Sequence, residues 1–251
     1  MFGRRRRRLA DPGGPAGGAS SFHCFWHLPP GVTGFREVWA TLDVLEEPTV
    51  PFTYFWALQA TFHDGAHPHG GAHLGLQWYP PHPGSRAVNW GGYHPNGAVI
   101  TGSTSELPST TNDPNTRDYP WRSGVSYRLR IARSPGGSFG WRGEVTDLGS
   151  GRTTVVRDLV ARGDWLVDPV VWTEAFAPCS APSASVRWSE LGGRTDDGTP
   201  IGIGSVSVNY QSHAAGGCAN TNSIQAPDGR GVIQTTNTDR RIRQGTRLPT
   251  R

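Results

Sequence analysis

Two segments decide the fold: Tyr54-Phe-Trp-Ala-Leu-Gln-Ala-Thr-Phe62 and His73-Leu-Gly-Leu-Gln-Trp78, separated by a loop rich in Gly and His. In the first segment the large apolar residues mostly share one parity, whereas Gln59 and Thr61 fall on the other. Side chains alternate between the two sides of a strand, so this period of two predicts strands with one face in a core. The two segments therefore predict an antiparallel hairpin.

The same pattern continues in both directions from the hairpin. Short apolar runs are punctuated by turn-forming residues, with 34 Gly and 21 Pro in 251 residues, and no helical periodicity exceeds two turns. Such a chain favours an all-β fold, a two-sheet antiparallel jelly roll of the concanavalin-like sandwich type. The expected strands span residues 35–45, 52–62, 72–79, 86–91, 98–102, 126–133, 139–147, 153–158, 170–176, 184–191, 204–210 and 231–235.

The basic charge is concentrated at the two ends of the sequence. All 24 basic residues are Arg, the net charge is +4, and ten of the Arg fall within residues 4–8 and 240–251. Residues 20–235 carry 14 Arg against 18 Asp and Glu, so the body is mildly acidic. We expect a disordered Arg/Gly/Pro arm over 1–20, one jelly-roll domain over 22–236 and a basic polar tail over 237–251. An acidic body does not favour nucleic acid as the partner.

The sequence contains no targeting or membrane signal that can be read directly. No apolar stretch approaches the roughly 18 residues of a membrane helix, so no membrane span is expected. The residues that follow Arg8 form no hydrophobic segment of the kind found in a secretory signal. Two localisations are therefore compatible with the sequence: the cell interior, or export directed by a signal outside this sequence. The sequence does not determine the oligomeric state.

Several expected strands carry an amide or acid in mid-strand, beside an aromatic residue. Aromatic rings stack on sugar faces, and amides and carboxylates bond to sugar hydroxyls. The pattern therefore predicts a lectin-like, non-catalytic glycan-binding module with carbohydrate as its partner. For each Trp, burial in the core is the competing interpretation. The candidate ligand-binding residues are Gln59, Gln77, Asn89, Trp90, Trp141, Trp172, Glu174 and Asn209.

An enzyme on the same scaffold is the main alternative. Glycoside hydrolysis needs two carboxyl groups facing one bond, and Glu144 and Glu174 are the catalytic candidates if both face one groove, with Asp147 as a third. A polysaccharide lyase would use Tyr93 or His94 as a base near an Arg such as Arg142. A capsid-like structural jelly roll with an Arg-rich arm is the third alternative.

The hairpin loop suggests a metal site as a further hypothesis. Imidazoles are common transition-metal ligands, and His67, His69 and His73 lie within one Gly-rich stretch. Their spacing matches no structural zinc pattern, so a solvated hairpin tip is the alternative. No other cofactor is expected.

Three cysteines are too few for a disulfide-built fold. A bridge between Cys179 and Cys218 would close a C-terminal loop, leave Cys24 unpaired and indicate an oxidising compartment. Three reduced thiols are the alternative.

The chain also resembles a known family. The hairpin is similar to the aromatic strand and Gly-Leu-Gln hairpin of bacterial β-sandwich proteins catalogued as domain of unknown function 3472, and the runs 120–130, 140–147 and 171–174 add to the likeness. The resemblance covers about residues 35–236. It implies a concanavalin-like jelly roll, usually exported and often beside carbohydrate-active domains, with no settled activity. This chain departs from the family in lacking an export signal and in its longer, His-rich loop.

Overall fold

The computed structural model describes residues 19–136 and 140–251. Within these ranges regular structure is almost entirely strand, with two short 3-10 helices, η1 (Pro83–Ser85) and η2 (His213–Ala215). The strands are β1 (Ser20–Trp26), β2 (Glu37–Glu46), β3 (Tyr54–His63), β4 (Pro68–Trp78), β5 (Arg86–Tyr93), β6 (Thr116–Asp118), β7 (Ser126–Arg133), β8 (Trp141–Asp147), β9 (Arg152–Leu159), β10 (Trp165–Ala175), β11 (Ser185–Arg194), β12 (Pro200–Gly202), β13 (Ser205–Tyr210), β14 (Asn222–Gln225), β15 (Val232–Thr235) and β16 (Arg247–Pro249).

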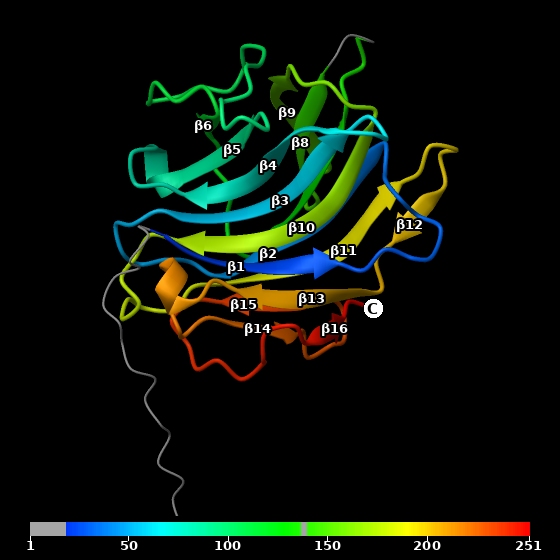
Figure 1. Cartoon of the computed structure of the whole chain (residues 1–251). Coiled ribbons are helices and arrows are strands. Elements are labelled where there is room, and N and C mark those ends of the chain that lie inside the picture. The colour runs from blue at the N-terminus through cyan, green and yellow to red at the C-terminus, as the bar shows by residue number, and fades with distance from the viewer. Residues whose placement is uncertain (1–18, 137–139) are drawn as a thin grey trace, which may run out of the picture.

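The strands form two antiparallel sheets that pack as a sandwich, so the predicted all-β jelly-roll class is confirmed. Sheet A has the order β16-β13-β1-β10-β3-β4-β5-β6. Sheet B has the order β14-β15-β11-β2-β7-β8-β9, with β12 beside β11. Figure 1 shows β10 lying between β1 and β3, strands that are far from it in sequence. The predicted hairpin is the β3 and β4 pair.

The core lies between the sheets and is filled by the residues that the parity of each strand assigned to it. Trp56, Leu58 and Phe62 of β3 are fully buried there. Trp141 of sheet B stacks on Phe62 of sheet A, with 5.2 Å between ring centroids. A large aromatic from one sheet against a ring from the other is a favourable way to fill the roughly 10 Å between packed sheets.

A buried glutamine ties the two sheets together. Gln234 of β15 is fully buried, and its Oε1 accepts hydrogen bonds from Thr173 of β10 and from the indole of Trp188, both at 2.9 Å. Its Nε2 donates to the carbonyl of Phe22 at 3.0 Å. Because these partners satisfy the amide, its burial carries no penalty for missing hydrogen bonds.

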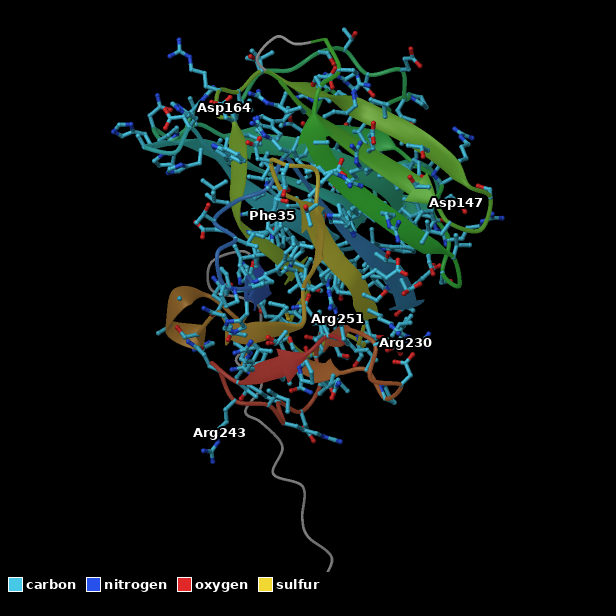
Figure 2. The ribbon with its side chains drawn as sticks, turned by 90° about the vertical axis from the view of Figure 1, so that its right-hand side faces the viewer. Phe35, Asp147, Asp164, Arg230, Arg243 and Arg251 are labelled. Carbon is cyan, nitrogen blue, oxygen red and sulfur yellow. A yellow bond between two sulfur atoms is a disulfide. The ribbon has the colours of Figure 1, made fainter. Side chains whose placement is uncertain are left out.

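The C-terminal segment differs from the expected basic tail. Within 237–251, β16 pairs with β13 and extends sheet A, and Leu248 packs into the core. Figure 2 shows Arg230, Arg243 and Arg251 in the lower half of the view, around the C-terminal segment drawn in red, and Asp164 in the upper half. The sequence did not reveal β16 because the apolar residues of the segment, Ile242 and Leu248, are each isolated among polar ones, and only the pairing with β13 shows the register. Of the expected arm over 1–20, residues 1–18 lie outside the described ranges, and Ser20 already begins β1.

Several short strands were not predicted. β1, β6, β12, β14 and β16 were missed. The expected strand 98–102 is irregular chain that makes isolated bridges through Val99 and Gly102. No helix in the described part of the chain has the length and apolar character needed to cross a membrane.

Candidate functional site

A groove of about 630 Å³ lies on the outer face of sheet A. Its side chains come from β1, β3, β4, β5, β6 and β10, together with residues beside these strands and Asp113 in the loop before β6. Outward residues of neighbouring strands face the same side of a sheet, so paired positions form rows across the groove. We call this hollow the sheet A groove.

One row of paired residues places an acid and an amide on either side of an aromatic ring. Phe55 of β3 pairs with Glu174 of β10 on one side and with Gln77 of β4 on the other. Two strand spacings separate the backbones of Glu174 and Gln77, about 10 Å. All three residues line the groove, so a group bound over Phe55 would lie between the acid and the amide.

Glu174 is the most unusual ionisable group in the groove. Its Oε1 accepts a hydrogen bond from the hydroxyl of Ser21 at 3.0 Å, and no Arg forms a salt bridge with it among the described residues. Burial raises the pKa of Glu174 above its ordinary value, and the Ser21 hydrogen bond opposes this rise only in part. Perturbed carboxyls in clefts are frequent acid–base groups.

Two amides in the groove keep unused hydrogen-bonding capacity. Gln77 is 8% exposed, and its Oε1 has no hydrogen-bond partner within the described structure. Asn89 is 7% exposed; its Nδ2 donates to Thr116 at 2.8 Å, while its Oδ1 has no partner there either. Gln59, by contrast, accepts from the indole of Trp172 at 3.1 Å.

Two histidines in the groove are held in the neutral form. Burial lowers the pKa of His73 to about 4, with Asp113 opposing weakly, and burial also lowers the pKa of His23. His73 packs edge-on against Phe55 and Trp172, with ring centroids at 5.4 and 5.8 Å. These rings form an aromatic cluster at the groove floor that carries no charge near neutral pH.

The structure assigns a structural role to two of the three predicted Trp platforms. Trp90 and Trp141 are fully buried between the sheets, where no ligand reaches them. Gly143 of sheet B makes room for Trp90, because a Cβ there would lie 2.7 Å from the indole. Trp172 does line the groove, but it is only 7% exposed and packs against Phe55.

The predicted carboxyl pair is not formed. Glu144 lies on β8 in the other sheet and is ion-paired with Arg130 at 2.7 Å on that sheet's outer face. Glu174 faces the opposite side of the sandwich, so the two acids share no groove. Arg142 is likewise on sheet B, where it pairs with Asp158. Tyr93 lies on β5 of sheet A, so the two residues belong to different sheets. The expected lyase group of Tyr93, His94 and Arg142 is therefore not assembled.

The three histidines of the predicted metal site do not converge. His69 and His73 are four residues apart on β4, about 13 Å along a strand. His69 bonds to Asp64 at 2.7 Å, His73 lies in the aromatic cluster, and His67 is exposed in the turn. In residues 19–136 and 140–251, no three His, Cys, Asp or Glu are arranged to hold a metal ion.

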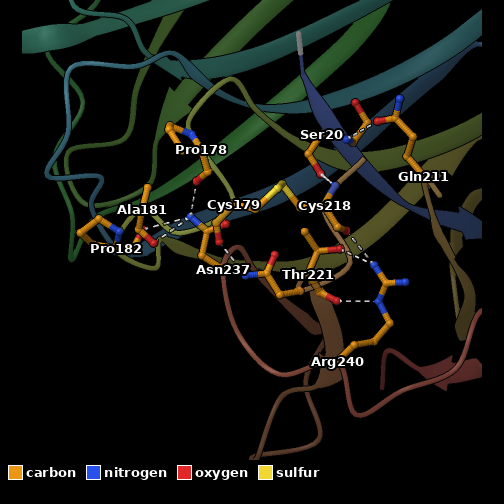
Figure 3. The surroundings of a disulfide bond; sticks show 12 residues. Ser20, Pro178, Cys179, Ala181, Pro182, Gln211, Cys218, Thr221, Asn237 and Arg240 are labelled. Atoms are coloured by element: carbon orange, nitrogen blue, oxygen red, sulfur yellow. Dashed lines mark hydrogen bonds between the residues drawn. A yellow bond between two sulfur atoms is a disulfide. The ribbon is translucent and has the colours of Figure 1, made fainter. Parts of the chain in front are cut away.

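The predicted disulfide between Cys179 and Cys218 is present, and Cys24 is a free, buried thiol. Figure 3 shows the bridge beside the start of β1, where Ser20 Oγ accepts from the backbone N–H of Cys218 at 2.8 Å. The next backbone N–H, that of Ser21, donates to Gln211 at 2.8 Å. These contacts hold the residue that bonds to Glu174.

Of the predicted ligand-binding residues, Gln59, Gln77, Asn89, Trp172 and Glu174 come together in the groove. Asn209 faces the same side of sheet A but lies one strand beyond β1, opposite His23, and does not line it. The sequence reasoning missed Ser21, His23 and Asp113. The first two were missed with β1, although the alternation of Phe22, Cys24 and Trp26 with polar residues was a usable signal.

A larger hollow of about 930 Å³ lies on the outer face of sheet B. In it Arg187 forms a salt bridge with Asp228 at 2.9 Å, and bonds to Thr41 and Arg128 lower the pKa of Glu190 despite its burial. The sheet A groove is smaller, but it holds the perturbed acid and the unpartnered amides.

No protein-family model matches the chain, and no curated protein matches it. Among solved structures it is similar to Scytalido-glutamic peptidase with a peptide-based transition state analog, at 11% identity over 87% of this chain and 98% of that one, with a TM-score of 0.45. SCP-B of the Eqolisin family of peptidases follows at 10% identity over 86% and 98%, with a TM-score of 0.42. An alginate lyase mutant with bound alginate trisaccharide matches at 12% identity over 82% and 70%, with a TM-score of 0.26. At such low identity the likeness concerns the β-sandwich fold alone.

Proposed function

We propose that the sheet A groove is the active site of a hydrolase that cleaves peptide bonds, with Glu174 as its general acid and base. The observation that carries this proposal is the position of Glu174: a mostly buried carboxyl of raised pKa that lines an open groove with Ser21 as its hydrogen-bond partner. A carboxyl that only bound hydroxyl groups would serve best in its ionised form. A raised pKa instead suits a group that both takes and returns a proton.

The chemistry needs a second group that stabilises negative charge on the substrate carbonyl oxygen. Gln77 is placed for this role, because its amide lies on the other side of Phe55 and donates N–H groups without changing charge. In the proposed reaction the Glu174 carboxylate takes a proton from water as the water oxygen attacks the carbonyl carbon. Protonated Glu174 then gives the proton to the leaving amine nitrogen as the C–N bond breaks.

Peptide bonds suit the groove better than glycosidic bonds. The usual glycosidase mechanisms need two carboxyls within roughly 5–10 Å of each other. The other acid in the groove, Asp113, lies beyond β5, which is three strand spacings from β10, or about 14 Å. One carboxyl and one amide are enough for acyl transfer to water.

The test is an assay of peptide cleavage. An unfolded protein or a peptide library is incubated with the protein between pH 3 and 7, and mass spectrometry identifies the products. We expect cleavage by the wild type and a loss of about 10²- to 10⁴-fold in Glu174→Gln, with a smaller loss in Gln77→Ala. Glu144→Gln is the matched control, because it changes the same residue type on the opposite sheet. Full activity in Glu174→Gln, or no cleavage by the wild type at any pH, contradicts the proposal.

A non-catalytic glycan-binding groove is the second candidate. The observation that favours it is the presence of Gln77 and Asn89 on the floor with Phe176 and Tyr93, 42% and 54% exposed, among the lining residues. These rings, and not Trp90 or Trp141, are the ones available for stacking on a sugar. Affinity electrophoresis in neutral polysaccharides tests it. Binding that falls in Phe176→Ala and Tyr93→Ala, with no peptide cleavage, would favour this candidate over the hydrolase.

A further inference from the structure

The end of the groove away from Glu174 is rich in hydrogen-bond acceptors. Asp113 lines the groove there, with its Oδ1 accepting from the backbone N–H of Asn115 at 2.9 Å and its Oδ2 accepting from the hydroxyl of Thr116 at 2.6 Å. Asn89 of β5 stands beside them through its bond to Thr116. These groups form one connected chain of hydrogen bonds at the β5 and β6 edge.

The chain of bonds determines which way the Asn89 amide points. Asp113 carries no proton to donate when it is ionised, so the single hydroxyl proton of Thr116 goes to Asp113. Thr116 Oγ1 must then accept from Asn89, which places the Nδ2 of Asn89 toward Thr116 and its Oδ1 away from it. That Oδ1 is buried and unpartnered in the described structure. A buried acceptor without a donor is costly, and a donor on a bound ligand would satisfy it.

Within residues 19–136 and 140–251, no cationic side chain lines this end of the groove. Among the described residues that line it there is no Arg, and the chain has no Lys. Arg157 is close enough to interact electrostatically with Asp113, but its guanidinium donates to the carbonyl of Pro114 and to Asn115 Oδ1, at 3.1 and 2.8 Å. Asp113 forms no salt bridge in the part of the chain that is described. A ligand group that carries both a positive charge and N–H donors would therefore bind favourably at this end of the groove.

We propose that Asp113 and the Asn89 Oδ1 form a subsite for a cationic side chain of the substrate, the guanidinium of Arg or the ammonium of Lys. Both cations carry several N–H donors and no acceptor, which matches a carboxylate and an unpartnered amide oxygen that line the same groove. Phe55 covers Gly75, the β4 residue paired with Asn89, so the floor beneath the subsite is aromatic. This subsite names a substrate class for the proposed hydrolase. Cleavage of such a substrate rests on the proposed function, whereas its binding at Asp113 and Asn89 does not.

The separation of the two ends sets where the cation lies in the substrate. Asn89 on β5 lies two strand spacings from Phe55 on β3, about 10 Å. An extended peptide advances about 3.3 Å per residue, so the cationic residue is expected roughly three residues from the bond over Phe55. A substrate without a basic residue at that distance leaves the Asp113 carboxylate without a cation and the Asn89 Oδ1 without a donor.

The experiment compares peptides that differ only in charge. A fluorescent octapeptide carries Arg, Lys, citrulline or norleucine at each position in turn, and binding is measured to the Glu174→Gln variant at pH 6. Citrulline is the neutral isostere of Arg. We expect Arg and Lys at one position to bind about tenfold more tightly than citrulline or norleucine, and this preference to vanish in Asp113→Asn and to persist in Asp113→Glu. Asp239→Asn, a substitution outside the groove, should leave it unchanged.

The outcomes separate this inference from the proposed function. Equal binding of Arg and citrulline at every position overturns the cationic subsite, even if the wild type cleaves peptides. A preference that survives Asp113→Asn also overturns it, because the charge would then be recognised elsewhere. A preference that depends on Asp113 in a wild-type protein that cleaves nothing supports the subsite and removes the hydrolase.

Discussion

The hydroxyl of Ser21, on β1, donates a 3.0 Å hydrogen bond to Oε1 of Glu174, on the neighbouring strand β10. This bond joins a residue near the start of the described chain to an acid more than 150 positions later. It lowers the pKa of Glu174, while burial of the carboxyl raises that pKa by more. The balance of the two effects sets the pH at which Glu174 gives up its proton.

Ser21→Ala is expected to move the pKa of Glu174 further upward. The variant removes the hydrogen bond that favours the ionised carboxylate and leaves the burial that disfavours it. A carboxyl titration by ¹³C NMR, or the acidic limb of the cleavage pH profile, measures the change. Ser189→Ala on sheet B is the matched control. An unchanged or lower pKa in Ser21→Ala would show that the hydroxyl does not stabilise the charge.

Glu174→Gln is expected to stabilise the fold at neutral pH. The folded pKa of Glu174 lies above its unfolded value, so its contribution to stability is complete below the unfolded pKa and is lost as pH rises through the folded pKa. Glutamine carries no charge and avoids this loss. The Tm of the variant should exceed that of the wild type at pH 7, with little difference at pH 3. A lower Tm at pH 7 contradicts the assignment of an uncompensated buried acid.

His73 is expected to make the protein less stable as the solution is acidified from pH 7 to pH 4. Its pKa is about 4 in the folded state against an ordinary 6.5, so the unfolded chain binds the proton first and stability falls between these values. The loss is at most about 3 kcal/mol. His73→Gln should flatten this part of the curve of unfolding free energy against pH, whereas His67→Gln, in the exposed turn, should not. A wild-type curve that is flat from pH 7 to 4 would contradict the prediction.

Reduction of the Cys179 and Cys218 bridge is expected to destabilise the protein by about 4 kcal/mol, since the bridge spans 39 residues of chain. The start of β1 should loosen as well, because Ser20 bonds to the backbone of Cys218. Thiol titration in denaturant should count one free thiol before reduction, that of Cys24, and three after it. Hydrogen exchange would show the local effect as faster exchange at the Ser21 amide. Unchanged exchange there would show that the bridge does not hold Ser21.

The alternation along strands was enough to identify most of the core and half of the groove. Tyr54, Trp56, Leu58 and Phe62 share a parity and are buried together, and Gln59 falls on the other face, as expected. Parity does not tell which outer face is hollowed, nor which strands lie side by side. For that reason Glu144 and Glu174 looked equivalent in the sequence, although they lie on opposite sides of the sandwich.

The sequence by itself determined the fold class and the hairpin, because both depend on local periodicity. For the cysteines it left a Cys179 to Cys218 bridge and three reduced thiols as alternatives, and the structure contains the bridge. Only the tertiary structure decided the site. Strand order brings Ser21, Glu174, Phe55 and Gln77 into one row, and long loops bring Asp113 to its edge. Burial then decided which aromatic rings are core and which acid has a raised pKa, and burial depends on the packing of segments far apart in the chain.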